Sequence, residues 1–288
     1  MTRTLLSLGH GFSARFLAAD LLAEGGWRVI GTTRSEAKRD ALRATGIEPI
    51  LWEDDALRGA LSQATHVLMS AAPDAGGDPA LAILADDLAQ AAKRLEWVGY
   101  LSTTGVYGNA DGAWVDETAP LNGHSRRALA RIKAEADWRA IPNLPVHSFR
   151  LAGIYGPGRG PFEKVRNGTA RRIIKPDQVF SRIHGADIAQ VLRASIARPN
   201  PGAAYNVCDN DPAPPQDVLA YAAELLGVPL PPEVPFDEAE MSPMARSFYA
   251  DNKRVSNRRI REELGVTLKY PDYKTGLQAV LVAESEAK

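Results

Sequence analysis

Short β-like runs alternate with helical segments through the first half of this 288-residue chain, and this alternation restricts the fold more than any other feature. The run TLLSLG at 4–9 is typical of a buried strand, and the apolar residues after it recur with the period of a helix. The same order repeats, with strands expected at 27–33, 48–52, 66–71, 97–103 and 145–153 and helices at 35–44, 80–94 and 125–139. Strict alternation predicts parallel strands joined by right-handed crossovers, hence an α/β fold with a doubly wound parallel sheet and helices on both faces.

The connection between the first strand and the first helix reads LGHGFSA, which places Gly9, Gly11 and Ala14 in the pattern G-x-G-x-x-A. Gly9 permits a tight turn, Gly11 lets a diphosphate touch the backbone, and Ala14 lets the helix pack closely on the strand. The N-terminus of the helix adds N–H groups and the positive end of the helix dipole. This pattern at a strand–helix junction predicts an NAD(P)-binding Rossmann domain, with Phe12 also beside the cofactor.

The end of the second strand indicates which dinucleotide is bound. An NAD-selective site carries an acidic residue near this point, whereas this chain has Thr33, Arg34 and Ser35. A guanidinium flanked by two hydroxyls suits a 2′-phosphate, and none of the three side chains would repel one. We therefore predict NADP as the cofactor, with NAD as the alternative.

After Gly156 the alternation ends. A turn cluster, GPGRGP, occupies 156–161, and proline and glycine are dense from 199 to 235. Further elements expected in this half are a strand at 204–209 and helices at 215–226 and 257–264. We predict a Rossmann core over 1–156 and a small C-terminal substrate-side lobe over 157–288, interleaved with the last elements of the sheet.

Composition excludes several classes of function. Lys and Arg number 34 against 35 Asp and Glu, so the net charge of −1 provides no field to attract nucleic acid or an anionic membrane. No apolar run approaches the roughly 18 residues of a membrane span, and the first apolar run is short for a signal peptide. The single cysteine, Cys208, fits a reducing compartment, so we expect a cytoplasmic protein. No residues have metal-ligand spacing, so no metal is expected.

Further motifs follow the glycine turn in a fixed order: LSTTGVYG at 101–108, FRLAGIYGPG at 149–158 and SRIHGADIAQVL at 181–192. Together they resemble the extended short-chain dehydrogenase/reductase family, which includes NAD-dependent sugar epimerases and dehydratases. The resemblance runs from residue 4 to about 210, and DNKRVSNRRIREELG at 251–265 is similar to the tail of an atypical bacterial branch. It implies a small-molecule substrate and allows a homodimer.

The resemblance also implies roles for single residues. Thr103 occupies the position at which the family has a Ser or Thr that orients a substrate hydroxyl or carbonyl. Asp54 is placed like the family's adenine contact. Small side chains after the fourth strand would let a dinucleotide lie close, namely those of Ala71, Ala72 and Pro73.

The substrate side is implied by residues of the later motifs. Tyr107 and Tyr155 lie in motifs that line the sugar site of the family, and Arg182 adds positive charge there. An anionic group such as a phosphate or carboxylate on the ligand would suit that charge.

The stretch SRRALARIKAE at 125–135 departs from the family, whose members carry Tyr-x-x-x-Lys here, because it contains no tyrosine. Anchoring on Glu135 places Arg127 at the tyrosine position and Arg131 at the lysine position. A register two residues later places Leu129 at the tyrosine position instead. The first register keeps a cation at the lysine position and fits the distance from Thr103 along the sequence.

Arg127 and Arg131 lie four residues apart, on one face of the expected helix. That face either looks into the site, as the resemblance implies, or is solvated. If it looks inward, Arg131 could donate to the nicotinamide ribose and Arg127 would place a fixed charge beside the substrate. An arginine does not lose its proton near neutral pH, so the usual tyrosine-mediated mechanism is not expected.

Two functions follow from these observations. In the first, the protein is an NAD(P)-dependent oxidoreductase- or epimerase-like enzyme that acts on a small carbonyl or sugar-like substrate, with Thr103 orienting the oxygen. In the second, it is a non-catalytic module that senses NADP(H) and works through a protein partner. The missing tyrosine favours the second function, whereas Thr103 and the C-terminal lobe favour the first.

Overall fold

The computed structural model describes residues 2–286. One seven-stranded sheet forms its centre, in the order β3-β2-β1-β4-β5-β7-β11, and every neighbouring pair is parallel. Its strands are β1 (Arg3–Leu8), β2 (Trp27–Thr33), β3 (Glu48–Leu51), β4 (His66–Met69), β5 (Trp97–Thr103), β7 (Val146–Leu151) and β11 (Ala204–Val207). The order reverses between β1 and β4, which is where an open parallel sheet binds its ligand.

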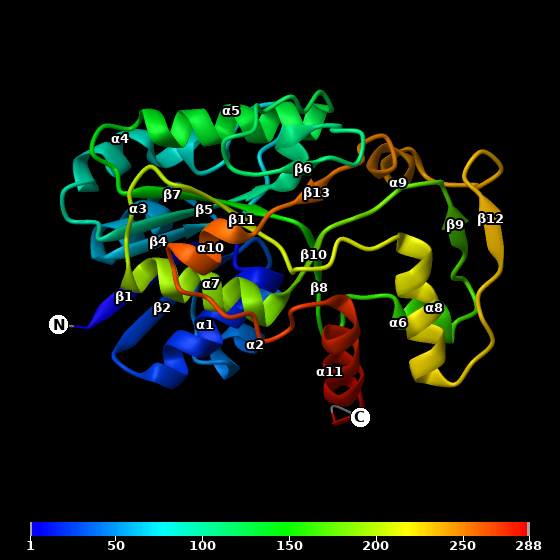
Figure 1. Ribbon diagram of the computed structural model, residues 1–288. Coiled ribbons are helices and arrows are strands. Elements are labelled where there is room, and N and C mark those ends of the chain that lie inside the picture. The colour runs from blue at the N-terminus through cyan, green and yellow to red at the C-terminus, as the bar shows by residue number, and fades with distance from the viewer. Residues whose placement is uncertain (1, 287–288) are drawn as a thin grey trace.

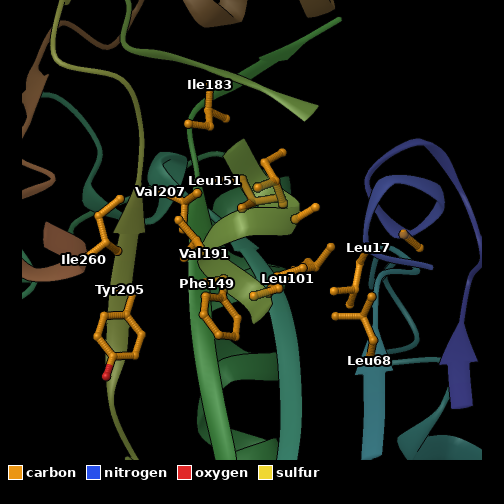
Figure 2. Packing of buried hydrophobic residues seen from close by; sticks show 14 of the residues in the cluster. Leu17, Leu68, Leu101, Phe149, Leu151, Ile183, Val191, Tyr205, Val207 and Ile260 are labelled. Atoms are coloured by element: carbon orange, nitrogen blue, oxygen red, sulfur yellow. The ribbon is translucent and has the colours of Figure 1, made fainter. Parts of the chain in front are cut away.

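Helices cover both faces of the sheet (Figure 1), and the prediction of a doubly wound α/β fold is confirmed. One face carries α1 (Phe12–Glu24) and α7 (Gly185–Ala197), and the other carries α3 (Asp54–Gln63), α4 (Leu81–Ala91) and α5 (Arg126–Ala140). Successive strand residues point to opposite faces, so Leu5 joins one apolar core and Leu6 the other. Leu101, Phe149 and Val191 meet in the first core (Figure 2).

Two predicted elements are divided in the structure. The helix expected at 35–44 is a 3-10 turn, η1 (Glu36–Lys38), followed by α2 (Arg39–Ala44), and neither buries a side chain that would hold one continuous helix. The strand expected at 145–153 ends at Leu151, and β8 (Gly153–Tyr155) then pairs with β10 (Arg182–His184) outside the main sheet.

The C-terminal lobe is built on a separate apolar cluster. Its other elements are α6 (Phe162–Arg166), β9 (Arg172–Ile174), α8 (Pro215–Leu226), β12 (Glu233–Pro235), α9 (Pro243–Phe248) and α11 (Tyr273–Glu286). Tyr155, Phe162, Ala222 and Leu277 belong to the buried cluster that joins α6, α8 and α11. In Figure 1 this group lies beside the end of the sheet to which β8 and β10 lead.

The last third of the chain returns to the first half. β13 (Arg254–Val255) pairs with β6 (Trp114–Val115), and α10 (Arg258–Glu262) packs beside β11. Farther along, the N–H groups of Lys269 and Tyr270 donate to the buried carboxylate of Asp187 at 2.7 and 3.1 Å. Burial raises the pKa of Asp187 to about 6. Residues of β11 and of the C-terminal segment thus complete the core that β1 begins.

Candidate functional site

A cleft of about 900 Å³ opens at the carboxyl ends of the central strands, between the sheet and the C-terminal lobe. Its wall includes the glycine turn before α1, the ends of β4, β5 and β7, one face of α5, and parts of β8, β10, α9 and the segment 251–255. These segments are far apart in sequence but line one cavity. The cleft therefore reaches from the glycine turn to the C-terminal lobe.

The glycine turn has no room for a larger residue at position 9. Gly9 has φ +79°, and a Cβ there would lie 2.6 Å from the backbone nitrogen of Ala71. The loop that follows β4 therefore lies directly against the glycine turn. The Gly9 N–H donates to Oγ1 of Thr32 at 2.7 Å, which fixes the turn against β2. Gly11 and Phe12 line the cleft, and Ala14 is buried where α1 meets the sheet.

The residues present fit a dinucleotide. Gly11 caps α1 without a side-chain hydrogen bond, so the first N–H groups of this 13-residue helix remain available at the cleft for a diphosphate. The hydroxyls of Ser70 and Ser102, at the ends of β4 and β5, have no hydrogen-bond partner among the described residues. Ala72 and Pro73 line the same wall. These groups would hold the diphosphate and offer hydrogen bonds to a bound molecule.

Besides Ala14 and Ala71, which pack behind the glycine turn, four predicted cofactor residues lie outside the wall of this cleft. Thr33 ends β2, its hydroxyl accepts from the N–H of Ser35 at 3.1 Å, and Arg34 extends from the same tip with its side chain exposed. Asp54 is the exposed first residue of α3. The structure therefore places a cation and two hydroxyls together at the tip of β2, and it places Asp54 apart from the cleft.

Both arginines of the unusual helix line the cleft, although Arg127 is also exposed to solvent whereas Arg131 is half-buried. Arg131 donates to the carbonyl of Leu101, and its guanidinium carbon lies 5.7 Å from the ring centre of Tyr100. Arg127 donates to the hydroxyl of Ser247 on α9 at 3.2 Å. Leu129 is 55% exposed and does not line the cleft, so the second register is wrong.

Thr103 ends β5 in the wall of the cleft, where the family resemblance puts a substrate-orienting hydroxyl. Its Oγ1 accepts from the N–H of Gly105 at 3.1 Å and so caps η2 (Thr104–Tyr107). Tyr107, at the other end of η2, is only 3% exposed and lies outside the wall. Because its hydroxyl donates to Asn206 at 2.7 Å and accepts from Arg150 at 2.9 Å, the structure places Tyr107 in a buried network and away from a ligand.

The other two predicted substrate residues are in the wall. Tyr155 donates to the carbonyl of Asp272 at 3.4 Å, and burial raises the pKa of its phenol. Arg182 donates through Nη1 to the carbonyls of Phe180 and Ala213 at 2.8 and 2.9 Å, and burial lowers the pKa of its guanidinium. A side chain fixed in this way can present its remaining N–H groups to a ligand with little loss of entropy.

Sequence reasoning missed three charged residues of the wall: Arg159, Asp251 and Lys253. Arg159 follows the β8 turn, and its guanidinium carbon lies 5.4 Å from the ring centre of Phe12. The other two belong to the stretch DNKRV, whose sequence indicates only a similarity to the tail of an atypical bacterial branch. No local pattern distinguishes these residues from surface charges, because only the tertiary fold brings them to the cleft.

The wall is strongly cationic. Its charged residues in the described part of the chain are Arg127, Arg131, Arg159, Arg182, Lys253 and a single carboxylate, Asp251. Within residues 2–286 no group of His, Cys, Asp and Glu side chains could hold a metal ion. The helices described there also include none long and apolar enough to cross a membrane.

The parallel sheet, its order of strands and the glycine turn define a dinucleotide-binding protein of the Rossmann type. A model of the NAD dependent epimerase/dehydratase family matches residues 8–208. The chain belongs to this family, which confirms the resemblance seen in the motifs and supports a nicotinamide cofactor.

Three known proteins are similar to this chain over nearly its whole length. Protein YeeZ of Escherichia coli K12 is 31% identical over 285 residues, which cover 92% of this chain and 95% of YeeZ. A conserved protein of unknown function from Silicibacter pomeroyi DSS is 60% identical, with 98% of this chain and 99% of that chain covered and a TM-score of 0.92. The dTDP-glucose 4,6-dehydratase of Bacillus anthracis strain Ames, solved in complex with NAD, shares the fold at 17% identity, 100% and 97% coverage and a TM-score of 0.81.

Proposed function

We propose that the protein is an NADP(H)-dependent oxidoreductase- or epimerase-like enzyme that acts on a small carbonyl or sugar-like substrate bearing an anionic group. One observation carries this proposal: a single cleft runs from the glycine turn past Thr103 to a cationic wall in the C-terminal lobe. A protein that bound only a dinucleotide would not need the second part of this cavity. A bound nicotinamide would supply or accept a hydride.

The preference for NADP rests on the tip of β2. Arg34 is exposed there between two hydroxyl residues, and Glu36, the nearest acidic residue in sequence, is paired with Arg39 at 2.8 Å. The guanidinium is therefore available to a 2′-phosphate, while the carboxylate is partly neutralised. NAD lacks that phosphate and would gain nothing from Arg34.

The substrate half of the cleft supports an anionic ligand. Arg182 is held in place by two carbonyls, and Arg159 lines the same cavity from the segment after β8. Thr103 offers a hydroxyl at the end of β5, where it can orient a substrate oxygen. Arg127 and Arg131 contribute fixed positive charge, and neither can exchange a proton near neutral pH.

A second function has one observation in its favour. The side chain at the family's tyrosine position is that of Arg127, and it contacts Ser247 and the ring of Phe248 on α9. Such contacts join α5 to the lobe and require no catalytic role for Arg127. In this alternative, the protein senses NADP(H) and transmits the bound state to a protein partner.

Titration calorimetry with NADPH and NADH tests the choice of cofactor. We expect NADPH to bind the wild-type protein more tightly, and Arg34→Ala to weaken NADPH by roughly ten- to a hundredfold, since it removes charge-assisted hydrogen bonds. NADH should bind both proteins alike. Arg43→Ala is the matched control, because Arg43 is exposed and pairs with Asp40 on α2. Equal affinities of the two dinucleotides would contradict the preference.

Turnover separates the enzyme from the sensor. With NADPH bound, we expect terephthalaldehydic acid, an anionic aldehyde, to be reduced faster than its neutral methyl ester, as followed by loss of the near-ultraviolet absorbance of the reduced nicotinamide. Tight binding of NADPH without consumption by either aldehyde would favour the sensor.

A further inference from the structure

We propose that Lys253 transfers the proton to and from the substrate oxygen in this cleft, in place of the tyrosine that α5 lacks. The proposal rests on the proposed function, because it assumes a carbonyl or alcohol in the substrate half. It assigns a catalytic role to a residue of the segment 251–255, which lies outside the family motifs.

The position of Lys253 is fixed from both sides by the backbone. The carbonyl of Asn252 accepts from the N–H groups of Ala110 and Gly112, both at 3.0 Å, and the N–H of Arg254 donates to the carbonyl of Ala113 at 3.0 Å. These bonds continue into the β6–β13 pair. The lysine therefore projects from a segment that is anchored to the Rossmann half, although it comes from the last part of the chain.

Its amine lies at the far end of the turn that Thr103 begins. Nζ donates to the carbonyl of Gly108 at 2.7 Å, and Gly108 is the residue that ends η2. Asp251 Oδ2 is 3.6 Å from the same nitrogen. A protonated amine has three N–H donors, so two can point to these partners while the third is free for a ligand in the cleft.

The other ionisable groups of the wall are poorer candidates. Its remaining cations are arginines, which do not release a proton near neutral pH. Three phenols also line the cleft, but burial raises their pKa and makes them weaker acids; they are Tyr155, Tyr249 and Tyr273. Among the lining residues of the described chain, Lys253 is the one lysine.

Burial makes this amine a better proton donor. The side chain of Lys253 is 10% exposed, and burial lowers its pKa below the ordinary 10.5, while nearby Asp251 acts in the opposite direction. The other charges of the cleft wall are cationic and offer the ammonium form no further counter-charge; they are Arg127 and Arg131 on α5, Arg159 after β8 and Arg182 on β10. A lysine shifted toward neutrality can give and accept a proton.

The proton balance is simple. In the reductive direction the carbonyl carbon gains a hydride, the π pair of the carbonyl bond moves to oxygen, and Nζ gives that oxygen one proton to form an alcohol. The neutral amine then recovers a proton from water. In the oxidative direction the neutral amine takes the hydroxyl proton as the carbon loses a hydride.

Labelling with pyridoxal phosphate tests the amine without any turnover. This anionic aldehyde condenses with a neutral amine, with loss of water, and borohydride then reduces the imine to a stable adduct that peptide mapping locates. We expect Lys253 to be labelled at lower pH than Lys133, whose side chain is 68% exposed on the outer side of α5. Failure to label Lys253, or labelling only at a pH as high as for Lys133, would overturn the proposal.

Variants provide the second test, with NADPH and terephthalaldehydic acid. Lys253→Arg keeps the cation and a donor to Gly108 but removes the transferable proton, so we expect kcat to fall roughly 100-fold with KM changed less than threefold. The kcat of Lys253→Met should fall by a similar factor, and Lys133→Arg should keep the wild-type kcat and KM. NADPH affinity should be unchanged in all three.

The outcomes separate the two proposals. A Lys253→Arg enzyme that retains kcat would overturn the role of Lys253 and leave the proposed function intact. A wild-type protein that binds no dinucleotide would instead refute the proposed function. If wild type binds NADPH but does not reduce the aldehyde, the labelling result alone decides whether Lys253 is a reactive amine.

Discussion

The two halves of the cleft are built in different ways. The cofactor half is formed mainly by backbone: Gly9 lies against Ala71, its N–H is held by Thr32, and the N–H groups of α1 are left free. The substrate half is formed by long charged side chains that come from four separate segments. A site made of backbone is defined by a few adjacent residues, whereas a site made of side chains depends on the whole fold that brings them together.

The substrate half also depends on a buried support. Glu135 and Arg150 are 1% and 3% exposed in their side chains and pair at 2.9 Å beneath α5. Arg150 continues to the hydroxyl of Tyr107, which donates to Asn206. This network links α5, β7, η2 and β11, so it holds the face of α5 that carries the two cleft arginines. We therefore expect the cofactor half to be most sensitive to an added atom. The substrate half should be most sensitive to the loss of an interaction partner.

The largest effect should come from Glu135→Gln, which leaves the buried guanidinium of Arg150 without its counter-charge. We expect the free energy of unfolding to fall by about 3–5 kcal/mol. Chemical denaturation at neutral pH measures this. Lys133→Met, which breaks the exposed pair with Asp137 on the same helix, should cost about 0.5 kcal/mol or less. Similar losses in the two variants would show that the buried network does not support α5.

A smaller effect is expected from Gly9→Ala in the cofactor half. The new Cβ would meet Ala71 at 2.6 Å and the backbone would keep φ +79°, so we expect a loss of about 2–4 kcal/mol of stability together with loss of NADPH binding. Gly25→Ala is the control. Gly25 has φ +80° with no atom within 4 Å of the added Cβ, so only the backbone penalty of about 1–2 kcal/mol remains. If both variants bind NADPH normally, close packing of the turn is not what holds the cofactor.

The smallest effect concerns pH and His184, whose ring packs edge-on against Phe16 of α1 and Tyr155 of β8. Burial, helped by Lys269, lowers the pKa of His184 from 6.5 to about 4. The unfolded chain therefore takes up a proton that the folded protein refuses, so the stability is complete above about pH 6.5 and is lost as the pH falls toward 4.

His184→Asn measures this contribution. Asn keeps a cap for the N–H of Ala186, which His184 Nδ1 accepts at 3.1 Å, but does not titrate. Denaturation at pH 7 and pH 5 should show that the wild-type protein loses about 2 kcal/mol more than the variant between these values. An equal loss in both proteins would mean that His184 is solvated enough to be protonated in the folded state.

The sequence was sufficient for the sheet and for the glycine turn. The alternation of strand-like and helical segments predicted the main strands, because most of these strands are buried apolar runs. The glycine turn was recognisable because its residues are adjacent. The register of α5 was left open by the sequence, and only the exposure of Leu129 against the inward Arg127 and Arg131 decided it. Tyr107 shows the limit of resemblance, since the motif residue is present but its hydroxyl is used inside the core.

The substrate half could not have been predicted in the same way. β6 and β13 have two residues each, which is too short for any periodicity, yet their pairing fixes Lys253. Arg159 and Asp251 have no neighbours in sequence that distinguish them from surface charges. Their approach to the cleft is a property of contacts between residues more than 100 positions apart, which local patterns do not contain.

The return of the C-terminal segment to the core has a consequence for synthesis. Val255, Ile260, Leu264 and Leu268 belong to the same buried cluster as Leu5. A ribosome that has produced the whole Rossmann half has therefore not yet made the side chains that complete the apolar core on one face of its sheet. Part of that core stays open to water until nearly the entire polypeptide has emerged, and such transiently exposed apolar surface favours aggregation during synthesis.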